Sequence, residues 1–113
     1  MKALVCEAFG TVEQLQIKDL PDLVPKDHEV CVAIKAAGVN FPDNLMVQGL
    51  YQFKPPVPFI PGSEFAGVVS AVGKDVKSLR VGARVTGFQM IGSFAEQATL
   101  SEMRCIALPD CVS

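Results

Sequence analysis

The sequence predicts a mainly β fold, closed into a barrel or a sandwich, with one helix. Short runs of apolar and β-branched residues recur along the chain, and glycines and prolines separate them. Only one stretch carries helix start and stop signals instead. Many short strands with such turns are typical of barrels and sandwiches. With 113 residues, 50% of them hydrophobic, we expect a packed core in one domain or part of one.

Seven segments have the composition of strands. The third has Val30, Val32 and Ile34 at alternate positions, the pattern of a half-buried strand. Glycines at positions 82, 87 and 92 mark turns between the later segments. The predicted strands are residues 1–8, 15–20, 29–37, 64–72, 83–88, 93–100 and 105–108.

The helix is expected over residues 44–48, because no helix breaker interrupts them before Gly49. Asn40 can accept a hydrogen bond from a free backbone N–H at the helix start, and Pro42 is tolerated in a first turn. Gly49 suits the position just after the helix. The Asn40 amide has a second interpretation, as a group presented to a bound cofactor or substrate, and both can hold.

Residues 55–61, PPVPFIP, contain four prolines and leave no room for a strand ladder. We expect a stiff, extended connection. It serves either as a plain linker between strands or as a rigid wall that positions Tyr51 and Ser63.

Charge and hydropathy exclude several classes of protein. The net charge is −2 and basic residues do not cluster, which argues against nucleic-acid binding. No apolar run approaches the roughly 18 residues that span a bilayer. Gly10 and Glu13 come too early for a secretory signal, so we expect a cytoplasmic protein.

The four cysteines form no C-x-x-C pair, and His28 is the single histidine, so no metal is expected. Cys6 and Cys31 lie in apolar runs and are interpreted as buried small hydrophobic residues. Cys105 and Cys111 would stay reduced in the cytosol. His28 lies in a charged turn and is expected to face solvent.

Two further residues have both a structural and a chemical interpretation. Tyr51, the only tyrosine, is either a packing residue at a loop edge or a hydrogen-bond donor to a substrate oxygen. Asp43 is either a first-turn acid favoured by the helix dipole or a carboxylate that orients the substrate.

The strand expected from residue 64 begins with a charged side chain. Glu64 would be costly to bury unpaired, and Arg84 is the predicted partner. Gly62 and Gly67 are expected to allow tight turns or close backbone approach. No G-x-G-x-x-G motif is present, so the chain lacks a pyrophosphate cradle of its own.

The motifs MKALV, AAGVNFPD, PGSEFAGVVSAVG, VGARV and GSFAEQATL follow one another along nearly the whole chain. Together they resemble the catalytic domain of the medium-chain dehydrogenase/reductase superfamily, in its zinc-free quinone oxidoreductase (zeta-crystallin-like) branch. Zinc-dependent relatives carry a cysteine at the position of Asn40 and a histidine at that of Ser63. The resemblance therefore implies a site without zinc.

The resemblance implies a GroES-like, partly open β-barrel over residues 1–113, with the Rossmann nucleotide-binding domain absent from this chain. The final PDCVS is similar to the run between the two domains. The implied function is the N-terminal segment of an NADPH-dependent quinone or enone reductase that transfers hydride without a metal. The complete protein is expected to be a homo-oligomer, and the segment alone to be inactive.

The resemblance also implies roles for single residues. Asn40 and Ser63 face the bound cofactor, Tyr51 lies near the substrate, and Asn40 and Tyr51 are the candidates to stabilise the developing oxyanion. Asp43 joins Tyr51 as a substrate-site candidate on the interpretation of the residue given above. Some quinone reductases have a tyrosine where this chain has Leu45, which leaves the substrate open. The alternatives are an enoyl-thioester reductase segment and a non-catalytic GroES-like binding module.

Overall fold

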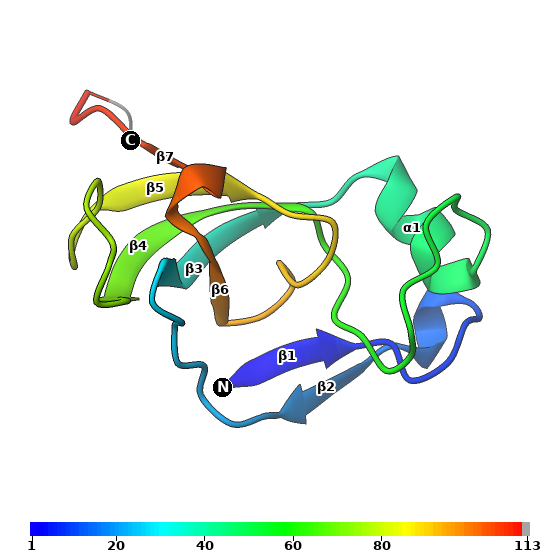
Figure 1. The fold of residues 1–113 in the computed structure, drawn as a ribbon. Coiled ribbons are helices and arrows are strands. Elements are labelled where there is room, and N and C mark those ends of the chain that lie inside the picture. Colours follow the sequence, from blue (N-terminus) through cyan, green and yellow to red (C-terminus); the bar gives the residue numbers. More distant parts are fainter. Residues whose placement is uncertain (112–113) are drawn as a thin grey trace.

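The computed structural model describes residues 1–111, which form a curled five-stranded sheet, a two-stranded hairpin and one α-helix (Figure 1). The predicted mainly β fold with one helix is confirmed. Val112 and Ser113, the end of the predicted domain, lie outside the described residues. The elements are β1 (Lys2–Val5), the 3₁₀ turn η1 (Val12–Gln14), β2 (Gln16–Asp19), β3 (Glu29–Gly38), α1 (Phe41–Gln48), β4 (Glu64–Val72), β5 (Arg84–Phe88), β6 (Gln97–Ser101), the 3₁₀ turn η2 (Glu102–Arg104) and β7 (Cys105–Ala107).

The large sheet has the strand order β6-β3-β4-β5-β7, and all its neighbours are antiparallel. The pairing of β3 with β4 shifts register between Cys31 and Val32 and again between Ile34 and Ala36. Such bulges bend a strand and increase its twist. The sheet therefore curls along β3 and β4 instead of lying flat (Figure 1).

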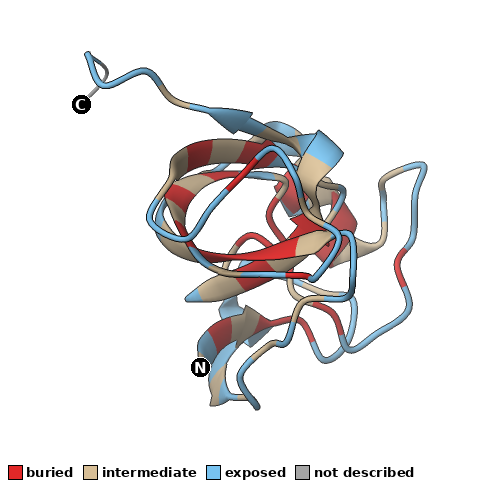
Figure 2. Cartoon of the chain, turned by 60° about the vertical axis from the view of Figure 1, so that its left-hand side comes forward, coloured by how far each residue is buried: buried red, intermediate tan, exposed pale blue. Residues whose placement is uncertain are grey.

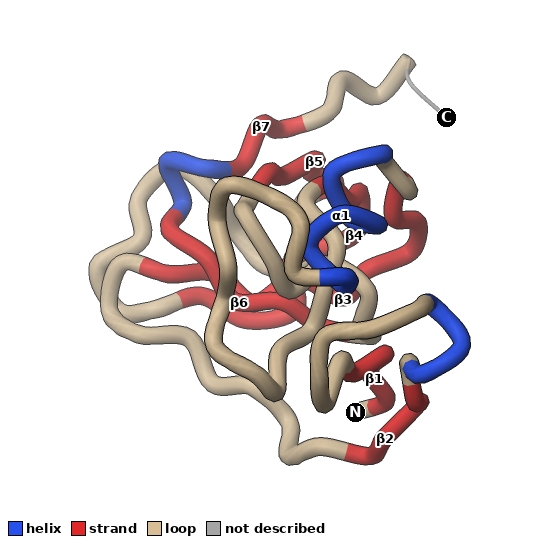
Figure 3. Tube along the Cα trace, turned by 90° about the vertical axis from the view of Figure 1, so that its right-hand side faces the viewer, coloured by secondary structure: helices blue, strands red, loops and turns tan. Residues whose placement is uncertain are grey.

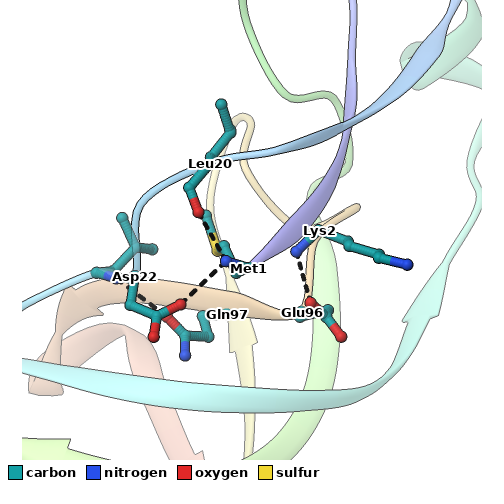
Figure 4. A network of polar contacts seen from close by, with 7 residues as sticks. Met1, Lys2, Leu20, Asp22, Glu96 and Gln97 are labelled. Carbon is teal, nitrogen blue, oxygen red and sulfur yellow. Dashed lines mark hydrogen bonds and ion pairs between the residues drawn. The ribbon is translucent and has the colours of Figure 1, made fainter.

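The β1–β2 hairpin continues the curl beyond β6. Ala3 forms a bridge with Ala95, and the Leu4 N–H donates to the Phe94 carbonyl oxygen at 2.8 Å. Figure 4 shows the neighbouring contacts, where the Lys2 N–H bonds Glu96 Oε1 at 2.5 Å. These bonds tie the hairpin to the residues just before β6, so the barrel is partly closed.

The core lies inside the curl. Along β4, Phe65, Gly67 and Val69 are buried, while the positions between them are more exposed. Figure 2 shows buried and less buried stretches alternating along the strands. A strand with one buried face produces this period of two. The main cluster contains Val30, Val32, Phe65, Val69, Leu79, Val85, Ala98 and Leu100.

A second, smaller cluster lies against α1 and consists of Cys6, Met46, Val47 and Phe59. Figures 1 and 3 place α1 above the β1–β2 hairpin, at the end of the molecule away from β7. The predicted burial of Cys6 and Cys31 is confirmed, since they are 1% and 2% exposed.

One strand prediction is wrong in detail, and the proline-rich connection makes one contact that was not predicted. The strand predicted over 93–100 begins at Gln97, because the Ser93 and Phe94 N–H groups donate to the carbonyl oxygens of residues 62 and 61. Residues 55–61 do form one bridge, in which Phe59 and Cys6 exchange hydrogen bonds of 2.8 and 3.1 Å. Phe59 keeps its N–H, whereas the flanking prolines prevent a longer ladder.

Both glycines predicted to permit close approach do so. Gly62 has φ +103°, and a Cβ there would lie 2.6 Å from the Phe94 ring. A Cβ on Gly67 would lie 2.2 Å from the Ala33 carbonyl oxygen, where β3 and β4 pack together. The Gly62 turn leads directly into the pocket described below.

The thiols are expected to react in order of exposure. Burial raises the pKa of the Cys6 and Cys105 thiols, whereas Cys111 is exposed. Timed alkylation followed by mass spectrometry should label Cys111 first, then Cys105, and Cys6 only on unfolding. Rapid labelling of Cys6 in the folded chain would contradict this order.

Burial of Cys6 also makes stability depend on pH. The unfolded Cys6 thiol loses its proton at lower pH than the folded one, so the free energy of unfolding should fall as the pH rises past the ordinary thiol pKa of 9.0.

Candidate functional site

A pocket of about 300 Å³ lies beside the first turn of α1, and we call it the helix-cap pocket. Three of the four predicted site residues, Asn40, Tyr51 and Ser63, line it. Its walls come from the cap of α1, the loop after α1, the start of β4 and the end of β5. The complete lining is Asn40, Pro42, Met46, Tyr51, Ser63, Glu64, Phe88 and Met90.

The first turn of α1 holds Asn40 at the pocket. Asn40 is the N-cap, its N–H donates to Asp43 Oδ2 at 2.8 Å, and the Asp43 N–H donates to the Asn40 carbonyl oxygen at 3.0 Å. This reciprocal pair anchors the backbone on both sides of the cap. The helix begins at Phe41, earlier than the predicted residue 44, because Pro42 fits the first turn without losing a hydrogen bond. Gly49 ends the helix in the left-handed conformation, as expected.

Asp43 does not line the pocket. Its side chain is 3% exposed, and Oδ1 has no hydrogen-bond partner within residues 1–111. A buried carboxylate is costly without a hydrogen-bond partner, and here the Asn40 N–H bonds its Oδ2. The carboxylate thus supports the start of α1, as the structural interpretation predicts. Its placement at the substrate stays a prediction.

Tyr51 combines both of its interpretations. The side chain is half-buried and packs against the cluster formed by Cys6, Met46, Val47 and Phe59, and it also lines the pocket. An aromatic ring with a polar tip suits this position between core and pocket.

The Ser63 backbone is tied to the residue that follows β5. Its carbonyl oxygen accepts a hydrogen bond from the Gln89 N–H at 2.8 Å, which joins the start of β4 to the end of β5. The residues before it, Pro61 and Gly62, are buried. The interpretation of the proline-rich segment as a wall that positions Tyr51 and Ser63, and not a plain linker, stays a prediction.

The predicted ion pair between Glu64 and Arg84 is wrong. Glu64 pairs with Phe88 across β4 and β5, whereas Arg84 pairs with Val68, four positions further along. Four residues of strand span roughly 13 Å. Glu64 is exposed and folds over Gly38, where a Cβ would lie 2.0 Å from Glu64 Oε1. The β4–β5 register could not be deduced from composition.

Five lining residues were not predicted as site residues: Pro42, Met46, Glu64, Phe88 and Met90. Met46 is 3% exposed and links the pocket to the core, while Phe88 and Met90 are 58% and 41% exposed. The sequence does carry a signal for Phe88 and Met90, because large apolar residues continue past the last buried position of β5. They add apolar surface to a pocket that Asn40, Tyr51 and Ser63 also line.

The described part of the chain lacks two other features. No group of three or more His, Cys, Asp or Glu side chains in residues 1–111 is placed to hold a metal ion. Within the same range, no helix has both the length and the apolar character needed to cross a bilayer.

The chemistry available in the pocket is hydrogen bonding beside an apolar surface. Asn40, Tyr51 and Ser63, which carry an amide, a phenol and a hydroxyl, line the pocket together. A concave, partly apolar site with a few polar groups is the usual form of a small-molecule site. Such a pocket suits a flat ring that carries a carbonyl or amide oxygen.

Comparison with known proteins gives the family. The model of the alcohol dehydrogenase GroES-like domain matches residues 26–110. Quinone oxidoreductase-like protein 2 of Rattus norvegicus is 38% identical over 112 residues, which cover 99% of this chain and 31% of that protein. Quinone oxidoreductase of Homo sapiens is 36% identical over 112 residues, covering 97% of this chain and 34% of that protein.

A solved structure supports the same family assignment. The Escherichia coli quinone oxidoreductase complexed with NADPH superposes with a TM-score of 0.94 at 32% identity, covering 100% of this chain and 35% of that one. The predicted GroES-like fold is thereby confirmed. The chain spans about a third of the length of the curated relatives it matches, with 31% and 34% of the first two covered. The chain belongs to the alcohol dehydrogenase GroES-like domain family, among relatives that are quinone oxidoreductases.

Proposed function

We propose that this chain is the catalytic domain of an NADPH-dependent reductase of quinones or enones, and that hydride transfer takes place at the helix-cap pocket without a metal. The observation that carries the proposal is the convergence of Asn40, Tyr51 and Ser63 on one pocket, in a chain similar to an NADPH-bound quinone oxidoreductase. A Rossmann domain following this segment, a homo-oligomeric complete protein and a cytoplasmic location belong to the same proposal.

The residues present fit one end of the cofactor. A nicotinamide ring carries a carboxamide, and the Asn40 amide and Ser63 hydroxyl can both donate to it and accept from it. The volume of about 300 Å³ accommodates such a ring. Since the sequence has no glycine-rich cradle, the phosphates would be held by the second domain. NADPH, when bound, supplies the hydride.

The protein groups would stabilise the charge that develops on the acceptor. The Tyr51 hydroxyl donates a hydrogen bond to the acceptor oxygen as it becomes negative, and the Asn40 amide is the second candidate donor. Donors that are already oriented are most effective because they need little reorganisation. Asp43 contributes indirectly, since it holds the Asn40 backbone at 2.8 Å. Solvent supplies the final proton.

The test is NADPH oxidation by the complete protein with a quinone, a simple enone and an enoyl thioester as acceptors. Rapid turnover of the quinone or the enone supports the proposal. Preference for the thioester would make the protein an enoyl-thioester reductase. No NADPH oxidation with any acceptor would contradict the proposal and leave a non-catalytic binding module.

The chain alone is expected to show no measurable turnover and weak or absent NADPH binding. It lacks a phosphate cradle, and phosphate contacts supply much of the binding energy for a dinucleotide. Calorimetric titration with NADPH is the measurement, with the complete protein as the positive control. Micromolar binding by the chain alone would contradict this expectation.

A further inference from the structure

We propose that Glu64 sets the charge specificity of the helix-cap pocket, so that the pocket selects uncharged acceptors over acceptors with a negative charge close to the reacting ring. This inference rests on the proposed function, because it concerns the quinone or enone that the pocket would take. It assigns a role to a carboxylate whose predicted partner, Arg84, lies elsewhere on the sheet.

Glu64 is held at the pocket by the pairing of β3 with β4. Glu64 pairs with Gly38 of β3, and Gly38 is two residues before Asn40. Its side chain occupies the space that a side chain at position 38 would fill, since a Cβ there would lie 2.0 Å from Oε1 and 2.8 Å from Cδ. Gly38 therefore leaves room for the carboxylate beside the helix cap, and both Glu64 and Asn40 line the pocket.

Among residues 1–111, no basic residue lines the pocket to neutralise this charge. Glu64 is the single charged residue among the described residues that line the pocket. The ion pairs found within residues 1–111 involve other acids: Glu7, Asp22, Asp27 and Asp75. The remaining polar groups on the wall are the neutral amide, phenol and hydroxyl of Asn40, Tyr51 and Ser63. An anionic acceptor would therefore meet a like charge and no counter-charge.

The expected discrimination is moderate. Two like unit charges roughly 5 Å apart with near-aqueous screening disfavour binding about fourfold, and weaker screening inside a pocket increases the factor to about tenfold. Because the carboxylate is exposed, added salt should reduce the effect.

The experiment compares anthraquinone-2-carboxamide with anthraquinone-2-carboxylate, a pair of nearly equal shape that differs by one charge. Their fused rings block addition of the cysteine thiols to the quinone. NADPH-dependent kcat/KM is measured for both quinones with the complete protein. The affinity of each quinone for the chain is measured by NMR titration at low and high salt.

The variants are Glu64→Gln, which removes the charge, and Gly38→Ala, which displaces the carboxylate without changing the net charge. Glu13→Gln in the exposed turn η1 is the matched control.

The proposal predicts a four- to tenfold preference for the carboxamide in the wild type and in the Glu13→Gln control. Glu64→Gln should bring the ratio below about twofold, Gly38→Ala should lower it, and high salt should weaken it. Equal use of both quinones by the wild type, or an unchanged ratio in Glu64→Gln, would overturn the inference while leaving the reductase function intact. A ratio that Gly38→Ala leaves unchanged would overturn the placement of the charge. Failure to reduce the carboxamide while another uncharged quinone or enone is turned over would overturn the inference alone, whereas no NADPH oxidation with any acceptor would reject the proposed function and this inference with it.

Discussion

Replacing Phe65 with alanine is expected to lower the free energy of unfolding by about 3–5 kcal/mol. The Phe65 side chain is 3% exposed and belongs to the main core cluster. It pairs with Gly87 on β5, and a Cβ on Gly87 would lie 2.5 Å from the tip of the Phe65 ring. The ring thus fills the space that a side chain on Gly87 would occupy, so its removal opens a cavity that the glycine cannot fill.

Urea denaturation followed by circular dichroism measures this loss. The control is Phe41→Ala, because Phe41 is 74% exposed and its truncation should change stability by less than about 1 kcal/mol. A Phe65→Ala chain as stable as the control would show that β4 and β5 do not pack through this ring. A loss of the expected size is a large part of the stability of an ordinary domain, so folding could fail outright.

Replacing Tyr51 with phenylalanine is expected to lower kcat/KM of the complete protein at least about tenfold, equivalent to about 1.4 kcal/mol of transition-state stabilisation. Phenylalanine keeps the ring that packs against Met46 and Phe59, so stability should change little. Only the hydroxyl that we assign to the acceptor oxygen is lost.

Steady-state kinetics with a quinone and NADPH, together with the melting temperature of the variant, separate the two roles of Tyr51. A loss of rate with an unchanged melting temperature supports the hydrogen-bond role. Unchanged kinetics would remove Tyr51 from the mechanism and restrict it to packing. A lower melting temperature would show that the hydroxyl also has a structural partner.

Local sequence signals predicted the strands well. The predicted segment 64–72 coincides with β4 (Glu64–Val72), because an apolar β-branched run follows the Gly62 turn and ends before Gly73. The start of the helix was placed too late, because the prediction counted only residues 44–48, which carry no breaker, although a first turn tolerates Pro42. The bridge between Cys6 and Phe59 joins distant segments, and no local pattern reports such a contact.

The candidate site could be predicted only in part, for a similar reason. The family motifs marked Asn40 and Ser63, which are far apart in sequence. The antiparallel pairing of Gly38 with Glu64 brings the two motifs together. Register of this kind depends on the bulges in β3 and on packing across the whole sheet. The same dependence explains why the partner of Glu64 was predicted incorrectly and why Phe88 and Met90 were missed.

A structure of the complete protein with NADPH and an uncharged quinone tests the central claim most directly. The account predicts the nicotinamide ring at the helix-cap pocket, within hydrogen-bonding distance of Asn40 or Ser63, and the quinone oxygen within reach of the Tyr51 hydroxyl. A nicotinamide bound elsewhere, with these three side chains facing neither cofactor nor quinone, would contradict it.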